Sequence, residues 1–380
     1  MFPLAGQAIR RVVWLRPFPA RFCCLTAGVS RVPFAALQGG GALLSVRGVT
    51  LGLLVLGGLM LAGDWALESM ETRPARVVED MVRSVHVSSP QSGAEALFQA
   101  TGCTTHFFLA WTTSSESFRL RYRRTVESAL RFHPEACVVV FSPTLPLDFF
   151  QRFWDLGYNV IVERPDIRAL LEGTPAEGWL RDVDRHRQGK YFYSHVTDIF
   201  RFATLHRYGG IYLDTDVIVM RSMEGLENCV GAELAGEQGE AKILNGAIMA
   251  FNRGSKFLWD CMAEFNATYR ADLWGWNGPE LVTRVAARYP RDNGELHILP
   301  TFAFYPIHWT KIKKYFAAEA LEEQHAVWME MQRHTYLIHY WNRVTTDLVP
   351  QPGSLMYKVL NNYCLMCNET SKDDGLPPIP

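Results

Sequence analysis

Short apolar runs alternate with segments of helical character through the middle of the chain, and this alternation constrains the fold more than any other feature. Apolar runs that fit buried strands occupy residues 105–111, 136–142 and 158–163, and a helical stretch at 116–132 separates the first two. Strands that alternate with helices pair in parallel, because each crossover returns the chain to the same end of the sheet. The sequence therefore predicts an α/β fold with a Rossmann-like, mainly parallel sheet flanked by helices, whose ligands bind at the carboxyl ends of the strands.

The alternation continues toward the C-terminus. Gly209 and Gly210 predict the end of a helix at 191–208, because glycine readily adopts the conformation that stops a helix. The polar, Arg-rich residues 173–188 are interpreted as a surface loop. The remaining predicted elements are a strand after Gly210, a strand at 243–252, helices at 255–269 and 278–288, a strand at 335–341 and a helix at 353–364.

Charge is distributed unevenly along the chain. The 380 residues are 48% apolar and 20% charged with a net charge of −1, which indicates a globular protein and gives no sign of nucleic-acid binding. Residues 1–63 contain no Asp or Glu but six arginines, all of them before the uncharged run 48–63. Because basic flanks stay in the cytosol, this pattern predicts a single-pass type II membrane anchor with the rest of the chain in the lumen.

The predicted organisation follows from that anchor. A basic tail (1–47) precedes a signal-anchor helix (48–67), a polar stem or linker (68–100) and a catalytic domain (101–380). The alternative is a cleaved transit peptide for a plastid or mitochondrion, since such peptides are likewise Arg-rich and free of acidic residues. Six cysteines follow the apolar run, and their pairing cannot be chosen from sequence; they are Cys103, Cys137, Cys229, Cys261, Cys364 and Cys367.

Two carboxylates stand where a predicted strand ends. Asp214 and Asp216 follow the run GGIYL, and the two-residue period of an extended chain directs their side chains the same way. A close carboxylate pair repels itself unless a cation lies between, so the pair suits a hard divalent metal ion. A strand-end turn with the carboxylates capping backbone N–H groups is the alternative. A second Asp-x-Asp, Asp182 and Asp184, falls in the predicted loop and is not interpreted as a site.

Upstream, Asp198 and Arg201 share one face of the predicted helix, since they are three residues apart, and an ordinary surface ion pair is the alternative for them. The segment from Ser194 to Asp216 resembles, as a unit, the DxD-containing sugar-binding region of glycosyltransferase family 32. The resemblance extends over about residues 105–364, and within the family the chain resembles the branch of α-1,4-N-acetylglucosaminyltransferases and α-1,4-galactosyltransferases (globotriaosylceramide synthases). Its further motifs are Asn245-Gly246, Gly278 to Arg284, Phe304-Tyr305-Pro306 and His339 to Asn342. Residues 1–100, 173–190, 236–242 and 311–333 match no motif, which leaves the acceptor open.

The resemblance implies a GT-A-type fold and a retaining transfer of a hexose or N-acetylhexosamine from a UDP-sugar to a glycan or glycolipid hydroxyl, forming an α-1,4 linkage in the Golgi. It implies Mn²⁺, or Mg²⁺, held by Asp214 and Asp216, with His339 as candidate third ligand; a packed strand histidine is the alternative for His339. Asn245 is the candidate polar group on the α-face of the donor sugar. The implied donor-binding residues are Asp198, Arg201, Tyr212, Asp214, Gly246, Gly278 and Pro279. Candidate acceptor platforms, all more ordinarily packing residues, are Trp274, Trp276, Trp309 and Trp341.

The same residues leave two alternative functions. The run IYLDTDVIV also approximates the haloacid-dehalogenase phosphatase signature, but Ile218 occupies the Thr/Val position and the required downstream Lys and acidic motif are absent. A nucleotide-sugar-binding protein without transfer activity is the non-enzymatic alternative, and the presence of Asp214, Asp216, Asp198 and Arg201 argues against it.

Overall fold

The computed structural model describes residues 92–290 and 294–369. The described residues all belong to the unit Asp64–Pro380, and residues 1–63 lie outside them. The predicted basic tail, signal anchor and most of the stem therefore lie outside the described residues. Within the described part of the chain, no helix is long and apolar enough to cross a membrane.

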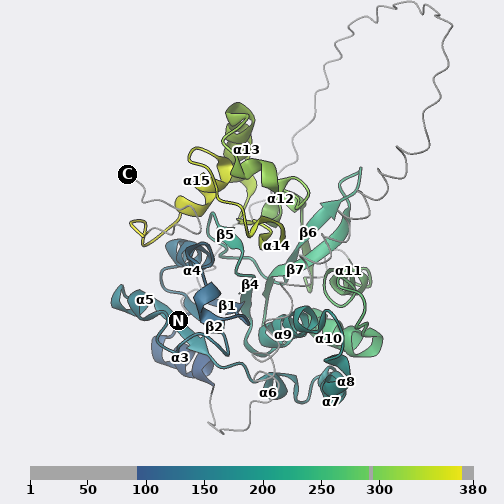
Figure 1. The fold of residues 1–380 in the computed structure, drawn as a ribbon. Helices are drawn as coiled ribbons and strands as arrows, with labels where there is room; N and C mark the ends of the chain where they lie inside the picture. The colour runs from purple at the N-terminus through teal and green to yellow at the C-terminus, as the bar shows by residue number, and fades with distance from the viewer. Residues whose placement is uncertain (1–91, 291–293, 370–380) are drawn as a thin grey trace, which may run out of the picture. The chain divides into compact units, whose positions relative to one another are not determined.

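A seven-stranded mixed sheet forms the centre of this unit (Figure 1). Its strand order is β3-β2-β1-β4-β7-β6-β8, and every neighbouring pair is parallel except the two that include β7. The prediction of an α/β fold with a mainly parallel sheet is thus confirmed. The strands are β1 (His106–Ala110), β2 (Cys137–Phe141), β3 (Asn159–Glu163), β4 (Gly210–Leu213), β6 (Cys229–Ala235), β7 (Ala241–Phe251) and β8 (His297–Leu299).

The antiparallel strand β7 has a local cause. A short turn joins it to β6, with the Gly236 amide donating to the Glu240 carbonyl at 2.7 Å. Two strands joined by so short a turn can only run antiparallel, whereas parallel strands need a crossover. The predicted strand at 243–252 therefore exists, but its partner β6 was not predicted.

Helices cover both faces of the sheet, because successive strand residues point to opposite sides (Figure 1). One apolar core contains Phe107 and Leu109 of β1 and residues of α4, α5, α12 and α15, and the other contains Phe108 and residues of α3, α6, α9, α10 and α11. The helices are α3 (Gly93–Thr101), η1 (Ser115–Ser117), α4 (Leu120–Phe132), α5 (Gln151–Asp155), α6 (Ile167–Leu171), α7 (Glu177–Arg181), α8 (Val183–His186), α9 (Phe192–Tyr208), α10 (Lys256–Thr268), α11 (Pro279–Ala286), α12 (Thr301–Phe304), η2 (Ile312–Phe316), α13 (Leu321–His334), α14 (Asn342–Thr345) and α15 (Leu355–Asn361).

The turn from α9 into β4 bears out the predicted glycine stop. Gly209 and Gly210 have φ angles of +68° and +118°, a region that disfavours any residue with a Cβ atom. A Cβ on Gly210 would also lie 2.6 Å from the His106 carbonyl oxygen of β1. The two glycines therefore allow the chain to reverse tightly and place β4 beside β1.

Two sequence interpretations need correction. Residues 173–188 are not simply a surface loop, because they include α7 and α8, and the side chain of Trp179 is fully buried against α10. The polar side chains of this segment face outward and outnumber its few buried apolar side chains, so the sequence of the segment resembles that of a loop. The ordered domain also begins before residue 101, since α3 starts at Gly93 and buries Ala94 and Leu97.

Helix α3 is fastened to β3 through a carboxyl group. The Ala94 amide donates to Glu163 Oε2 at 2.7 Å, and burial, opposed by this hydrogen bond, raises the pKa of Glu163 to about 7. A carboxyl whose pKa is higher in the folded state stabilises the fold below its unfolded value, and this stabilisation is lost as the pH rises through about 7.

We expect Glu163→Gln to flatten this pH dependence. Glutamine keeps an acceptor for the Ala94 amide but cannot ionise, so the variant should not lose the stability, on the order of 2 kcal/mol, that the wild type loses between pH 4.5 and 7.5. Urea unfolding at several pH values measures the difference. The exposed Glu172, changed to Gln, is the control and should retain the wild-type slope; an equal slope in Glu163→Gln would contradict the assignment.

A second, two-stranded sheet joins β5 (Val217–Val219) to β9 (Leu337–His339). Strand β5 directly follows the Asp-x-Asp segment, so the C-terminal part of the chain is brought to the carboxyl end of β4. In Figure 1 β5 lies near α12 to α15, in the upper part of the view. Among residues 92–290 and 294–369 there are two disulfides, Cys103–Cys137 and Cys364–Cys367, while Cys229 and Cys261 are buried free thiols.

Candidate active site

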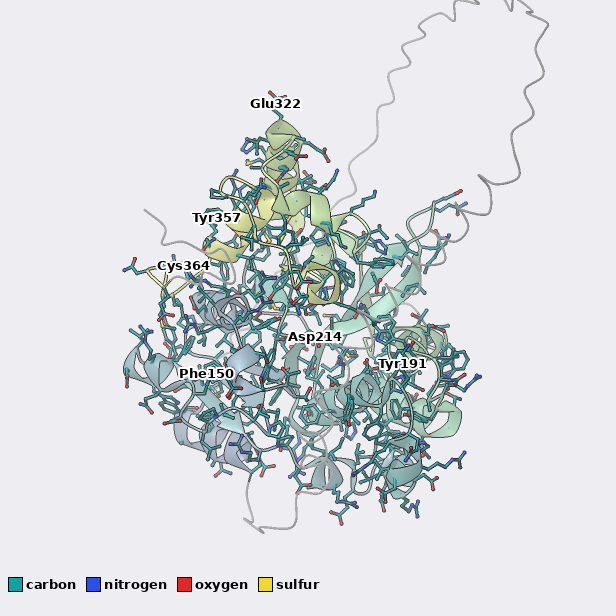
Figure 2. The ribbon with its side chains drawn as sticks, viewed as in Figure 1. Phe150, Tyr191, Asp214, Glu322, Tyr357 and Cys364 are labelled. Atoms are coloured by element: carbon teal, nitrogen blue, oxygen red, sulfur yellow. A yellow bond between two sulfur atoms is a disulfide. The ribbon has the colours of Figure 1, made fainter. Side chains whose placement is uncertain are left out.

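Backbone hydrogen bonds hold the Asp-x-Asp segment at the carboxyl end of β4. The Asp214 amide donates to the Ala247 carbonyl of β7 at 2.8 Å, and the Thr215 carbonyl accepts from Thr125 Oγ1 of α4 at 2.6 Å. Asp214 lies between the C-terminal helices and α9 in the view of Figure 2. The two carboxylates therefore lie on a loop that is fixed by the neighbouring strand β7 and by helix α4.

Strand pairing brings His339 to this loop. In the β5–β9 ladder Val217 is opposite His339, so the imidazole lies beside Asp216, with Nε2 3.1 Å from Asp216 Oδ1. The Asn342 amide donates to the other oxygen, Oδ2, at 2.7 Å. Asp214, Asp216 and His339 each offer a ligand atom, and these three atoms lie within 4.8 Å of one another. The structure thus brings together the three candidate metal ligands, and their role in binding a metal ion stays a prediction.

The hydrogen bonds of His339 determine its tautomer. Its Nδ1 accepts from the Trp341 amide at 3.2 Å, so the neutral ring carries its proton on Nε2 and donates it to Asp216. Binding of a cation by Nε2 requires that proton to move to Nδ1, at the expense of the Trp341 contact. Two carboxylates and an imidazole remain a donor set that suits Mn²⁺ or Mg²⁺ better than a soft metal.

Arg201 lies between two carboxylates. Its Nη2 is 3.2 Å from Asp214 Oδ1, its Nη1 is 3.6 Å from Asp198 Oδ1, and the guanidinium is 5.0 Å from the centre of the Tyr212 ring. Both Asp198 and Arg201 are buried. The sequence-predicted donor residues on α9 and β4 therefore form one charged cluster that continues directly into the Asp-x-Asp loop.

Two glycines make room for this cluster. A Cβ on Gly246 would lie 3.1 Å from Arg201 Nη1, and one on Gly278 would lie 2.7 Å from Asp198 Oδ2. Gly278 precedes Pro279, which begins α11 with its fixed φ. The absence of a side chain at Gly246 and Gly278 lets the backbone lie close to Arg201 and Asp198, and a larger side chain there would displace these two charged groups.

The charges of the cluster are unbalanced without a cation. Burial and the neighbouring Asp216 raise the pKa of Asp214 above its ordinary value, although Arg201 opposes them. Burial also raises the pKa of Asp216, but the His339 imidazole outweighs it and holds that pKa below its ordinary value. Burial raises the pKa of Asp198 to about 7. A divalent ion between Asp214 and Asp216 would relieve the repulsion that raises the pKa of Asp214.

Asn245 is engaged at both polar ends. Its Oδ1 accepts from the Ala247 amide at 2.8 Å, and its Nδ2 donates to Glu233 Oε2 at 2.8 Å. Its role at the donor sugar stays a prediction. Sequence reasoning missed Glu233, because a lone Glu on an unpredicted strand carries no motif.

The four candidate tryptophans separate into two groups. Trp341 is buried, with Nε1 donating to the Ile307 carbonyl, and Trp276 is partly buried beneath the guanidinium of Arg284. Trp309 and Trp274 are 45% and 47% exposed, so only these two present a broad surface to solvent.

Two protein families match successive parts of the chain. Residues 120–235 match the family described as "Glycosyltransferase sugar-binding region containing DXD motif", and residues 250–371 match "Alpha 1,4-glycosyltransferase conserved region". A lactosylceramide 4-alpha-galactosyltransferase of Mus musculus is 34% identical over 275 residues, which cover 68% of this chain and 73% of that protein. This chain belongs to the α-1,4-glycosyltransferase family and carries its DXD sugar-binding region. Family membership decides against the phosphatase alternative.

Two further relatives and one solved structure are also similar to this chain. An Alpha-1,4-N-acetylglucosaminyltransferase of Homo sapiens is 29% identical over 266 residues, covering 63% of this chain and 73% of that protein. A protein of Arabidopsis thaliana described as uncharacterized is 36% identical over 286 residues; the match covers 72% of this chain and less than half, 44%, of that relative. Among solved structures, the apo-form glycosyltransferase GlyE of Streptococcus pneumoniae aligns with a TM-score of 0.40 and 13% identity, over 69% of this chain and 60% of that one.

The role of His339 as a metal ligand gives a testable expectation. Burial alone would lower the pKa of His339, but the Asp216 carboxylate raises it above its ordinary 6.5, so protons should compete with Mn²⁺ from above pH 6.5 downward. His339→Ala should weaken Mn²⁺ binding at pH 7.5 by roughly tenfold to a hundredfold, by analogy with other single changes around metal sites, and should bind Mn²⁺ with a flatter pH dependence. Calorimetry at pH 7.5 and 5.5 measures both. The exposed His334→Ala is the control, and wild-type behaviour of His339→Ala would make His339 a packing residue.

Proposed function

We propose that this protein is a metal-dependent, retaining glycosyltransferase of GT-A type that transfers a hexose or N-acetylhexosamine from a UDP-sugar to a hydroxyl of a glycan or glycolipid. The observation that carries the proposal is the convergence of Asp214, Asp216 and His339 within 4.8 Å, at the carboxyl end of a strand in a family that is defined by a DXD sugar-binding region. The α-1,4 linkage rests on the family description and on the names of its relatives.

The divalent ion, when bound, supplies positive charge to the leaving diphosphate. Asp214 and Asp216 would hold that ion, with Asp216 fixed by the Asn342 amide and by the His339 ring. Arg201 would contact donor phosphate or sugar, and Asp198 keeps its guanidinium in place. Such prearranged charges stabilise a developing anion without reorganising during the reaction.

The cellular setting is also a proposal. Disulfides form in oxidising compartments, and the two in this structure, together with the acid-free N-terminal region, support a single-pass type II protein with its catalytic part in the Golgi lumen.

The experiment that tests the proposed function is a nucleotide-release assay. Full-length protein in detergent is incubated with a panel of UDP- and GDP-sugars, with Mn²⁺ or with EDTA and no acceptor, and free nucleoside diphosphate is measured. We expect slow, Mn²⁺-dependent UDP release from UDP-galactose or UDP-N-acetylglucosamine. Equal release with EDTA, or release from none of the donors, would contradict the proposal.

A further inference from the structure

A β-bulge directs one carboxylate toward the candidate active site. In the β6–β7 ladder Ala232 is opposite Leu244 and Leu234 is opposite Ile243, so the intervening Glu233 has no partner residue. Bulges of this kind re-aim a side chain and are frequent beside active sites. The Glu233 side chain is only 14% exposed, and its Oε2 accepts a hydrogen bond from Asn245 Nδ2 at 2.8 Å. Asn245 Oδ1 in turn accepts from the backbone amide of Ala247, and the Ala247 carbonyl accepts from the backbone amide of Asp214.

Glu233 also faces His308, which lies on the loop after α12. Its Oε1 is 3.8 Å from His308 Nε2, and in the described part of the chain His308 is the only basic side chain within 4.0 Å of this carboxylate. The His308 Nδ1 lies 2.9 Å from Thr310 Oγ1 and accepts from the Thr310 amide at 3.4 Å, so Nε2 is the ring nitrogen that faces Glu233. The 3.8 Å between Nε2 and Glu233 Oε1 is too long for a direct hydrogen bond between the two side chains.

Aromatic rings connect this pair to the metal ligands and to solvent. The His308 ring is 5.3 Å from Trp309, which is 45% exposed, and 6.3 Å from the buried Trp341. Trp341 contacts His339 at 4.2 Å between ring centres. A carboxylate and an imidazole beside an exposed indole form a combination suited to a pyranose, whose hydroxyls need polar partners and whose C–H face packs on an aromatic ring.

We propose that Glu233, His308 and Trp309 form the subsite for the acceptor sugar, a terminal pyranose. The name of the 34%-identical relative, a lactosylceramide 4-alpha-galactosyltransferase, makes the β-galactoside end of a lactoside the probe for this subsite. Glu233 accepts a hydrogen bond from an acceptor hydroxyl, His308 Nε2 donates to the same or the neighbouring oxygen, and Trp309 covers the face of the ring. Asn245 fixes the Glu233 carboxylate and couples this subsite to the donor side. The inference rests on the proposed function and adds the residues that select the acceptor.

Steady-state kinetics with methyl β-lactoside as acceptor and UDP-galactose with Mn²⁺ as donor test the subsite. Full-length wild type is compared with Glu233→Gln, His308→Ala and Trp309→Ala. We expect each variant to raise the KM for methyl β-lactoside by roughly tenfold or more, since each loses a contact worth about a factor of ten in affinity, while the KM for UDP-galactose changes less than about threefold. Melting temperatures identify any variant that fails to fold.

Matched controls lie away from the subsite. The exposed Glu322 at the tip of α13, labelled in Figure 2, is changed to Gln, and the 39%-exposed Trp259 of α10 is changed to Ala; both should keep the wild-type KM for each substrate. Folded subsite variants with an unchanged KM for the lactoside overturn the proposal. If wild type releases UDP from UDP-galactose but does not glycosylate the lactoside, the acceptor subsite is wrong and the donor function stands. If no UDP is released from any donor, the proposed function itself fails.

Discussion

Asp216→Asn is expected to lower Mn²⁺-dependent UDP-sugar turnover by roughly a hundredfold or more while leaving the protein folded. Asparagine can still accept the Asn342 hydrogen bond, so the loop should keep its conformation. It removes the negative charge that would hold the cation, and losing charge stabilisation of the leaving group costs several kcal/mol, at about 1.4 kcal/mol for each factor of ten in rate. Initial rates of UDP release at saturating donor, with circular dichroism as a check on folding, measure the effect.

The matched control is the other Asp-x-Asp pair of the chain. Asp182 is exposed at the junction of α7 and α8, and Asp182→Asn should leave turnover within about twofold of wild type. Turnover near the wild-type level in folded Asp216→Asn would contradict the metal assignment, because catalysis would then not depend on the Asp216 carboxylate.

Arg201→Ala is expected to have the largest effect on stability of any single change at the site. It leaves the buried Asp198 carboxylate and the partly exposed Asp214 carboxylate without their cation, and breaking a buried ion pair such as Asp198–Arg201 costs about 3–5 kcal/mol. The double variant Asp198→Asn with Arg201→Ala should recover part of that loss, because one of the stranded charges is gone. Urea denaturation of the three proteins measures both differences.

Helix α9 supplies its own control for this prediction. Arg207 lies on the same helix and pairs with Glu95 at 3.3 Å, but both side chains are more than one-third exposed. Arg207→Ala should therefore cost only about 0–1 kcal/mol. Equal costs for Arg201→Ala and Arg207→Ala would mean that the charged cluster of the site is solvated and not held in a buried network.

Local patterns in the sequence were enough to predict most of the sheet. Buried parallel strands appear as continuous apolar runs, so β1, β2 and β3 and the helix α9 were predicted close to their observed bounds. Strand β6 was missed, because its apolar start is followed by the polar residues of a hairpin that give no clear period. The helices α7 and α8 were missed because short helices anchored by one or two apolar side chains resemble loops in sequence.

Some residues of the candidate site could likewise be predicted from local sequence patterns, and others could not. Asp214 and Asp216 could be selected from their position after a strand. Helical spacing puts Asp198 and Arg201 on one face, but only the family resemblance distinguishes them from an ordinary surface ion pair. His339 could be paired with them only through a family resemblance, since its proximity depends on the β5–β9 ladder between distant parts of the chain. Glu233 and His308 meet through a bulge and a loop, and no short-range pattern encodes either.

A calorimetric titration of UDP into the full-length protein at pH 7.5, with and without Mn²⁺, tests the central claim most directly. If Asp214 and Asp216 hold a cation that also binds the diphosphate, Mn²⁺ must tighten UDP binding, and UDP must tighten Mn²⁺ binding by the same factor. We predict a gain of roughly tenfold or more in wild type, corresponding to at least about 1.4 kcal/mol, and none in Asp216→Asn. The same UDP affinity with and without Mn²⁺ in the wild-type protein would contradict the account.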